Sequence, residues 1–559
     1  MAEGIIPFQS IVAQEVELVT YFILISHTRL LLAYASLDPT PLAPGATSSS
    51  TTTPVLNLSS HEVIAGLRKP RPYTPIAWGD FFLNHNPCTQ SQYLAMKDMA
   101  SIKNERVRKF ILDAGCSSDL AMKIDLVDTL ERTGVAYHYG QEIEELLHGM
   151  HSEENVFGDN LCVTAMRFYL LRKHGYNISP DVFLKFKDDQ GNFASNDVNS
   201  LLALYNAPYL RIHGEEMLDD DVTFTKTQLQ SMVEHLEPRL AEEVLCTLET
   251  PHFRRVERVE TRRYIAVYEK KATRDEDILE FAKFDFNILQ TLYCEELKAL
   301  TIWWKDLKSQ ANPQFARDRI VEVHFWILGV LYEPQYSYPR IMLTKLVLFM
   351  SLLDDLYDNY STTEESNIFT AAMQRYSTCG GMMIDVVKCY HAEVNWRDEH
   401  FVPTTVEEHL QLSMASSACM HIISLVFISL GDVTTKDNLE WAFSYPKFIR
   451  GVCIVGRIGN DMVSHEREQG SNHMVSTVQT CTIEHGITVV EANEKLKVII
   501  EEAWMDIVHE RLLKKHSMVL LEKATNLART MDFMYKREDE YTLSFSLKKT
   551  LTSLYVNFI

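Results

Sequence analysis

The feature that most constrains this chain is an apolar run that ends in three aspartates, Ile341–Asp358 (IMLTKLVLFMSLLDDLYD). The apolar residues up to Leu353 predict a buried helix. Asp354 and Asp358 are four positions apart and therefore share one face of that helix, while Asp355 lies about 100° round from Asp354. Carboxylates that converge at the end of a buried helix are costly unless a cation neutralises them.

We interpret these aspartates as a Mg²⁺ site. Mg²⁺ prefers carboxylate and water oxygens and commonly bridges to substrate phosphates. The alternative is a solvated last helical turn, but acidic side chains at a helix C-terminus oppose the helix dipole. The metal site is therefore the better interpretation.

Length and charge restrict the class of protein. A chain of 559 residues is long for one hydrophobic core, so two domains are expected. The chain has 54 Lys and Arg against 76 Asp and Glu, and its net charge of -22 argues against a nucleic-acid partner. The cysteines form no CxxC pair, which indicates a reducing compartment and no zinc site.

The first 67 residues differ in composition from the rest. The apolar run Leu18–Ala35 is interrupted by His27 and Arg29 and is too short to span a bilayer, so no membrane partner is expected. Acidic residues outnumber arginine in the first 60 residues, unlike in a transit peptide, and this favours a cytoplasmic location. Pro, Ser, Thr and Ala dominate residues 37–60, so we expect residues 1–67 to be a disordered extension.

The remainder of the chain has helical periodicity. From Arg68 almost to the end, apolar residues recur at intervals of three and four, and strand-like alternation is hard to find. The predicted fold class is all-α. The length fits two helical halves, which we assign to residues 68–285 and 286–559.

A second group of polar residues lies in the segment GVCIVGRIGNDMVSHERE. Asn460, Ser464 and Glu468 are four positions apart in turn, so one helical face presents an amide oxygen, a hydroxyl and a carboxylate. All three are hard ligands that suit a further Mg²⁺. Arg457 lies three residues earlier on nearly the same face and is placed to bind an anion shared with the metal. Asp461 is expected to face outward.

Two arginines precede the aspartate motif in the segment ARDR. Arg317 and Arg319 can hold phosphate in bidentate geometry, although a surface turn with ion pairs is an equal alternative when this segment is taken alone. Trp326 follows among aliphatic residues, where a core position is the default interpretation. The charged segment Met534–Thr542 (MYKREDEYT) fits either an exposed loop or a lid over a phosphate site.

With both acidic motifs in view, the chain resembles plant terpene synthases of class I, in which catalysis begins with ionisation, and most closely the cytosolic sesquiterpene synthases. The resemblance covers residues 68–559. Its motifs in this sequence are RKPRPYTPIAW (68–78), RDR (317–319), DDLYD (354–358) and NDMVSHERE (460–468). The DDxxD motif alone is weak, but together with the NDxxSxxxE motif and RDR in this order it is very specific.

The resemblance implies a fold and a metal content. It implies an N-terminal α-barrel domain without catalysis (68–285), followed by a C-terminal class I terpenoid synthase helical bundle (286–559) whose cavity holds the substrate. It also implies three Mg²⁺, with Mn²⁺ as a possible substitute. The implied metal ligands are Asp354, Asp355, Asp358, Asn460, Ser464 and Glu468.

The resemblance also implies roles for the remaining residues. Substrate diphosphate contacts are implied for Arg317, Arg319, Asp354, Asp358, Arg457 and Asn460. Catalytic roles are implied for Arg317, for Trp326 as the aromatic floor of the cavity, and for Asp539 with Tyr541. In this last pair the middle residue is Glu540, where the family usually has Gly.

The activity implied is Mg²⁺-dependent ionisation of farnesyl diphosphate, giving a sesquiterpene and free diphosphate, by a monomer that acts on this small molecule. A monoterpene synthase that uses geranyl diphosphate is the nearest alternative. A third alternative is a catalytically inactive helical variant, because Asp354 and Asn460 are only 106 positions apart. This spacing is shorter than the family pattern, and a segment that would form one cavity wall is expected to be missing near residues 376–383.

Overall fold

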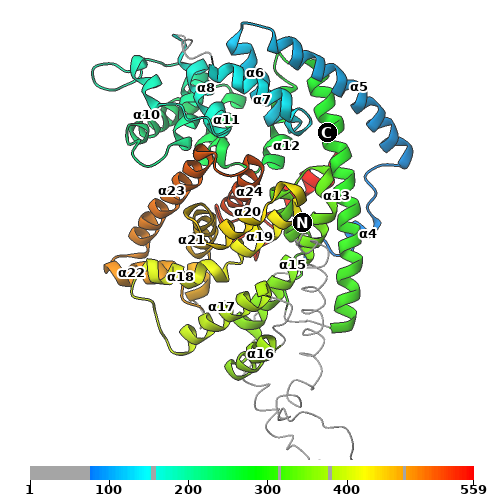
Figure 1. The fold of residues 1–559 in the computed structure, drawn as a ribbon, viewed down its shortest axis with the longest axis vertical. Coiled ribbons are helices and arrows are strands. Elements are labelled where there is room, and N and C mark those ends of the chain that lie inside the picture. Colours follow the sequence, from blue (N-terminus) through cyan, green and yellow to red (C-terminus); the bar gives the residue numbers. More distant parts are fainter. Residues whose placement is uncertain (1–75, 153–158, 312–315, 376–380, 470–473) are drawn as a thin grey trace, which may run out of the picture.

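The computed structural model describes residues 76–559 apart from 153–158, 312–315, 376–380 and 470–473. The proposed disordered extension, most of the RKPRPYTPIAW segment and most of the join near 376–383 lie outside the described residues. Within the described part the chain is helical, and its β-structure is limited to an isolated bridge between Lys187 and Phe193. The all-α prediction is confirmed, and the helices form two adjoining groups (Figure 1).

The first group of helices begins repeatedly at residues that cap a helix N-terminus. The side chains of Thr89, Asp119, Asn160 and Asp197 each accept a hydrogen bond from a backbone N–H in the first turn of α5, α6, α8 and α9. The helices of this group are α4 (Phe81–Asn84), α5 (Gln90–Gly115), α6 (Leu120–Arg132), α7 (Gly140–Ser152), α8 (Leu161–Lys173), α9 (Val198–Asn206), α10 (Met217–Met232), α11 (Pro238–Glu249) and α12 (Glu257–Tyr268).

The second group surrounds a cavity that both acidic motifs reach. It starts with the long helix α13. Helix α15, which ends in the first aspartates of the acidic motif, continues into a π-helical turn, Leu356–Tyr360. Its helices are α13 (Glu276–Ala311), α14 (Ile320–Val330), α15 (Ser337–Asp355), α16 (Thr363–Arg375), α17 (Gly381–Asp398), α18 (Val406–Ser416), α19 (Cys419–Ser429), α20 (Lys436–Phe443), α21 (Lys447–Gln469), α22 (Thr477–His485), α23 (Val489–Leu513), α24 (Met518–Met534) and α25 (Lys548–Tyr555).

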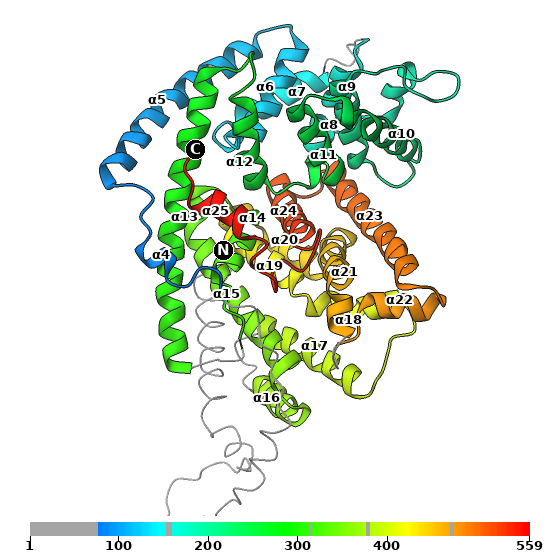
Figure 2. The same cartoon turned by 180° about the vertical axis from the view of Figure 1, so that it is seen from behind.

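Helix α13 joins the two groups. It runs through the predicted domain boundary at 285/286 without interruption and packs along α5 on one side and against α14 and α15 on the other. The C-terminal helix α25 lies against it as well (Figure 2). The Asn287 and Gln290 side chains of α13 donate hydrogen bonds to the carbonyls of Ile559 and Leu554, at 3.1 and 2.9 Å. The same helix therefore fixes the end of the chain.

A buried polar network holds α13, α14 and α15 together. Glu296 accepts hydrogen bonds from His324 (2.8 Å) and from two nitrogens of Arg340 (2.8 and 2.6 Å), and all three side chains are at most 2% exposed. Burial favours the neutral form of Glu296, but the hydrogen bonds from His324 and Arg340 outweigh it and lower the pKa of Glu296 to about 2. The network therefore contains an ionised carboxylate at neutral pH.

Two glycines allow helices to approach closely around the site. A Cβ on Gly329 of α14 would collide with the Thr530 hydroxyl of α24, and a Cβ on Gly451 of α21 would lie 2.9 Å from the carbonyl oxygen of Ala503 on α23. Close backbone approach of this kind requires the missing side chain. Helix α14 is thus packed against the Thr530 side chain of α24, and α21 against the backbone of α23.

No single helix in the described ranges is long and apolar enough to cross a membrane. Helices α18 and α19 reach the required length and composition only as a pair, across a bend of 44°. The bend occurs at Ala418, whose backbone has the left-handed φ of 58°.

Removing Glu296 tests the buried network. Glu296→Ala leaves the fully buried Arg340 guanidinium without its carboxylate, and we expect a loss of about 3–5 kcal/mol of stability, measured as a lower thermal unfolding midpoint. The control is Glu440→Ala, because Glu440 is 65% exposed in its ion pair with Lys436. This control should stay within about 0.5 kcal/mol of the unaltered protein. Equal midpoints for the two variants would contradict the assignment.

Candidate functional site

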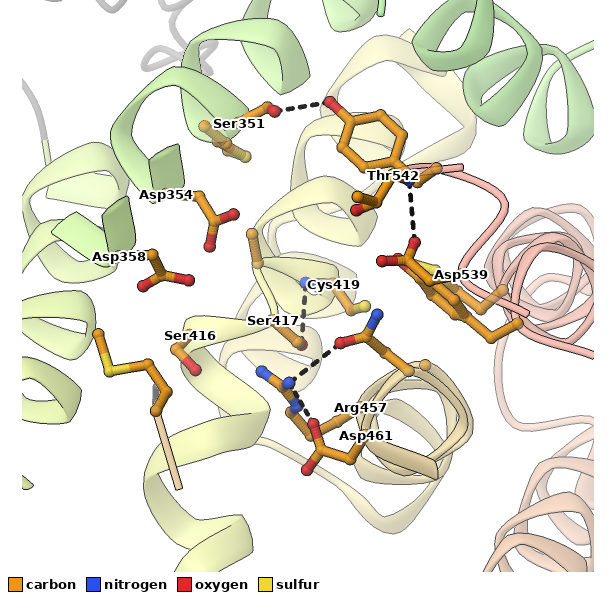
Figure 3. A pocket seen from close by; sticks show the side chains of 18 of the residues that line it. Ser351, Asp354, Asp358, Ser416, Ser417, Cys419, Arg457, Asp461, Asp539 and Thr542 are labelled. Atoms are coloured by element: carbon orange, nitrogen blue, oxygen red, sulfur yellow. Dashed lines mark hydrogen bonds and ion pairs between the residues drawn. The ribbon is translucent and has the colours of Figure 1, made fainter. Parts of the chain in front are cut away.

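The cavity of the second helix group has a volume of about 550 Å³. Its lining comes from α14, α15, α17, α18, α19, α21, α24 and the loop after α24, so segments far apart in the sequence meet around it (Figure 3). The apolar and aromatic lining residues include Trp326, Val347, Met350, Tyr390, Ile422, Met531, Tyr535 and Tyr541. The charged and polar ones include Arg317, Asp354, Asp358, Glu393, Arg457, Asn460, Asp461, Arg467, Glu468, Asp539 and Thr542.

The first acidic motif divides between the cavity and the protein interior. Asp354, in the last turn of α15, and Asp358, in the π-helical turn, lie side by side at the cavity (Figure 3). Asp355 is only 1% exposed and does not line the cavity, because it is rotated to another face of the helix. Its two oxygens accept from the backbone N–H of Arg317 (2.7 Å) and contact the Arg317 Nε (2.8 Å). Asp355 therefore supports Arg317, and the metal-ligand role that the resemblance implied for it stays a prediction.

The two arginines of the RDR segment have different surroundings. Arg317 lines the cavity, where its guanidinium contacts Asp354 (2.5 Å) and donates to the Thr542 hydroxyl (3.2 Å). Arg319 is 1% exposed and lies outside the cavity lining. It donates to the backbone carbonyls of Tyr541 (2.9 Å) and Thr542 (3.0 Å). Arg319 thus fastens the loop after α24, and the direct substrate contact that the resemblance implied stays a prediction.

The second motif lies on α21. Asn460 and Glu468 line the cavity, and Ser464 is fully buried between them. Arg457 lines the cavity too, donates to Asn460 (3.2 Å) and forms a very short ion pair with Asp461 (Figure 3).

The expectation that Asp461 faces outward is wrong. This residue is 1% exposed and lines the cavity, and its second oxygen accepts from the backbone N–H of Thr477 at 2.7 Å. The Asp461 carboxylate therefore has two partners, which are Arg457 one helical turn earlier and the backbone N–H of Thr477 at the start of α22.

The carboxylates around the cavity repel one another. Removal from bulk water, followed by the charges of Asp354 and Glu393, raises the pKa of Asp358 well above its usual value. Burial and the neighbouring Asp461 raise the pKa of Glu468. Such a site favours either protons or a multivalent cation.

Two residues of α17 belong to the site although they were not among the residues predicted from the sequence. Tyr390 and Glu393 both line the cavity, and Glu393 accepts a hydrogen bond of 2.5 Å from the Ser416 hydroxyl. Burial raises the pKa of Glu393 to about 7, although Arg457 opposes the shift. A single Glu on an amphipathic helix is usually solvated, and only its position three residues after a Tyr hints at a shared buried face.

Aromatic rings form part of the same cavity. The Trp326 ring lies 5.2 Å from the Tyr541 ring and 6.2 Å from the Tyr535 ring, so Trp326 has a place in the cavity as well as in the core. The Tyr541 hydroxyl donates to the Ser351 hydroxyl at 2.6 Å, and the Arg317 guanidinium lies 4.9 Å from the Tyr541 ring centre. These π faces can stabilise a cation in the cavity.

The oxygen donors fit Mg²⁺ or Mn²⁺. The Ser464 hydroxyl lies beside Glu468, and its hydrogen bond opposes the rise that burial causes in the pKa of Glu468. Among the described residues, no three His, Cys, Asp or Glu side chains close on one point. The ligand set must therefore include Asn460, Ser464, water or substrate oxygens, which agrees with the preference of Mg²⁺ for retained waters and phosphate oxygens.

Two family models match the sequence. The terpene synthase N-terminal domain matches residues 77–248. The terpene synthase family metal-binding domain matches residues 305–382 and 377–506, in two pieces that meet within the region where a missing segment is expected.

Named relatives extend the match over most of the chain. An (E)-beta-caryophyllene synthase from Zea mays is 52% identical over 522 positions, covering 86% of this chain and 95% of the relative. Because 86% of 559 residues is about 480, some 40 of those positions have no counterpart here. A beta-sesquiphellandrene synthase from Sorghum bicolor is 40% identical, covering 88% of this chain and 97% of the relative.

A solved structure shares the fold. Isoprene synthase from Populus x canescens, in complex with three Mg²⁺ ions and dimethylallyl-S-thiolodiphosphate, is 26% identical, with a TM-score of 0.77 over 83% of this chain and 97% of that one. The two family models, the relatives and this likeness agree on the family and the fold. The chain belongs to the terpene synthase family and is a terpene synthase with its N-terminal and metal-binding domains.

Proposed function

We propose that this chain is a Mg²⁺-dependent sesquiterpene synthase that ionises farnesyl diphosphate and releases a sesquiterpene and diphosphate. The observation that carries the proposal is the convergence of two oxygen-ligand groups, on α15 and α21, on a cavity that also holds Arg317, Arg457 and aromatic rings. The names of the maize and sorghum relatives support a sesquiterpene product. The Mg²⁺ ions in the poplar enzyme support the choice of metal.

Ionisation requires stabilisation of the negative charge that grows on the departing diphosphate. Asp354, Asp358, Asn460, Ser464 and Glu468 would hold the Mg²⁺ ions, which when bound neutralise that charge. Arg317 and Arg457 lie in the same lining and present guanidinium groups suited to diphosphate oxygens. Each guanidinium is kept at the cavity by a carboxylate partner before the diphosphate binds.

The allylic cation left behind must be kept from water and base. Trp326, Tyr535 and Tyr541 present rings to the cavity, and Val347, Met350 and Ile422 add apolar surface. Rings stabilise a cation without reacting as bases, and apolar side chains exclude the water that would quench it. Cyclisation is then directed by the shape of this surface.

We further propose that the enzyme works as a cytoplasmic monomer on the prenyl diphosphate alone. The acidic charge of -22 supports the absence of a nucleic-acid partner. Geranyl diphosphate is the alternative substrate, since a cavity of about 550 Å³ falls in the general range of small-molecule sites and does not by its volume select one chain length.

A second candidate is a folded protein without turnover. It is favoured by the two-piece match of the metal-binding domain and by the positions of the maize relative that have no counterpart here. A cavity wall that lacks part of its helices admits water, which competes with cyclisation. Against this candidate, α17 follows the join directly and supplies Tyr390 and Glu393 to the cavity.

Product analysis separates these candidates. Purified protein with Mg²⁺ and farnesyl diphosphate should give sesquiterpenes in gas chromatography with mass spectrometry, and geranyl diphosphate should give less product. A preference for geranyl diphosphate would support the monoterpene alternative. A folded protein that yields nothing from either substrate would favour the inactive variant.

Replacing Asp358 tests the ligand assignment. Asp358→Asn keeps the shape of the side chain but removes a charge, and we expect turnover to fall by about 10²–10³-fold with an unchanged circular dichroism spectrum. Asp385→Asn is the control, because Asp385 lies on α17 and is 61% exposed in its pair with Lys388. Equal turnover in the two variants would refute the role of Asp358.

Metal binding should depend on pH. The pKa values of Asp358, Glu393 and Glu468 are raised in the folded chain, so these groups bind more protons there than in the unfolded chain. Without divalent cations, the stability of the fold should therefore fall as pH rises from about 4.5 through 7. Mg²⁺ must displace those protons, at about 1.4 kcal/mol per group and pH unit below the pKa.

The measurement is the rise in thermal midpoint on adding Mg²⁺. It should be larger at pH 8 than at pH 6, and Glu393→Gln should reduce the difference between the two pH values because one titrating group is lost. A rise that is the same at both pH values would show that binding of the cation is not linked to the protonation of these carboxylates.

A further inference from the structure

The loop after α24, residues Tyr535–Leu547, forms one edge of the cavity and is fastened on the side of α14 and α15. Arg319 donates to the carbonyls of Tyr541 and Thr542, and the Tyr541 hydroxyl donates to Ser351 on α15. Arg317 donates to the Thr542 hydroxyl. These contacts set the position of the Tyr541 ring beside Trp326.

On the side of α21 the loop is held by an ion pair. The Arg467 guanidinium lies 2.6 Å from an oxygen of Asp539 and 3.6 Å from an oxygen of Glu468. Asp539 is 4% exposed and Arg467 is 37% exposed, so the pair closes over a buried carboxylate at the edge of the cavity. The other oxygen of Asp539 accepts the backbone N–H of Thr542 at 3.0 Å (Figure 3).

Asp539 therefore connects two parts of the molecule. One oxygen shapes the turn that presents Tyr541 and Thr542, and the other receives the arginine from α21. Arg467 directly precedes Glu468, which belongs to the second ligand group. The loop thus spans the distance between that group and the Arg317–Asp354 pair of the first group.

We propose that Arg467 is a positioning residue, which acts through Asp539 to hold the Asp539–Thr542 segment at the cavity edge, so that Tyr541 shields the reacting cation from water. This inference rests on the proposed function for its last step, while the contact with the loop stands independently of it. A charge-assisted hydrogen bond to a buried carboxylate is among the stronger side-chain contacts. Losing it leaves Asp539 without its cationic partner.

Limited proteolysis tests the contact without metal or substrate. Lys536 and Arg537 lie in the loop and are trypsin sites, so cleavage there reports how often the loop opens. We expect Arg467→Gln to be cleaved on the order of tenfold faster, equivalent to about 1.4 kcal/mol in the opening equilibrium. Arg467→Lys retains a cation and should restore most of the protection.

The matched control is Glu249→Gln. Glu249 of α11 pairs with Arg537 of the same loop, but the two side chains are 40% and 72% exposed, so this pair should contribute little. The inference is overturned if Arg467→Gln is cleaved at the rate of the unaltered chain, if the lysine variant gives no protection, or if the control opens the loop equally.

Products provide the functional readout. With farnesyl diphosphate, Arg467→Gln should raise the share of water-quenched alcohols relative to hydrocarbons, and the lysine variant should reverse this. The Mg²⁺ concentration for half-maximal rate should stay the same, and a change in it without a change in products would mean that Arg467 acts on Glu468, which overturns the positioning role. If the loop opens as expected but the unaltered chain makes no product, it is the proposed function that fails.

Discussion

The constraint on which this structure depends is the crowding of carboxylates around one partly buried cavity. Helices from distant parts of the sequence bring them together, and burial with mutual repulsion raises the pKa of several of them. Arg317 and Arg457 neutralise part of the charge, each through a close carboxylate partner. The carboxylates are Asp354, Asp358, Glu393, Asp461, Glu468 and Asp539.

Holding such a cluster requires rigid support outside it. The network of Glu296, His324 and Arg340 ties together α13, α14 and α15. The Arg317 segment joins the first two of these helices, and the third carries the start of the first acidic motif. The close approaches at Gly329 and Gly451 fix α14 and α21 against α24 and α23. Ligands on rigid elements keep their geometry when charge enters the site, which is what a site built for charged transition states needs.

The sequence predicts those parts of the site that lie within one helix. Helical periodicity alone places Asp354 with Asp358, and Asn460 with Ser464 and Glu468. It does not predict which way neighbouring residues turn once helices pack, so Asp355 and Asp461 have partners that the pattern does not reveal. Glu393 enters the site only because α17 packs beside the π-helical turn, a contact between separate segments. The domain boundary predicted at 285/286 lies inside the continuous helix α13, which belongs to both groups of helices.

The paired charges also bear on how a diphosphate and metal ions would enter this cavity. Arg317 contacts Asp354, and Arg457 contacts Asn460 and Asp461. The arginines suited to an anion are therefore held by side chains that are themselves suited to a cation, or that neighbour such a side chain on the helix. An anion alone would draw an arginine from its carboxylate and leave that charge unpaired, and a cation alone would do the same to the arginine. When both bind, each charge gains a partner. The arrangement therefore couples the two binding events, and each ligand should bind more tightly in the presence of the other.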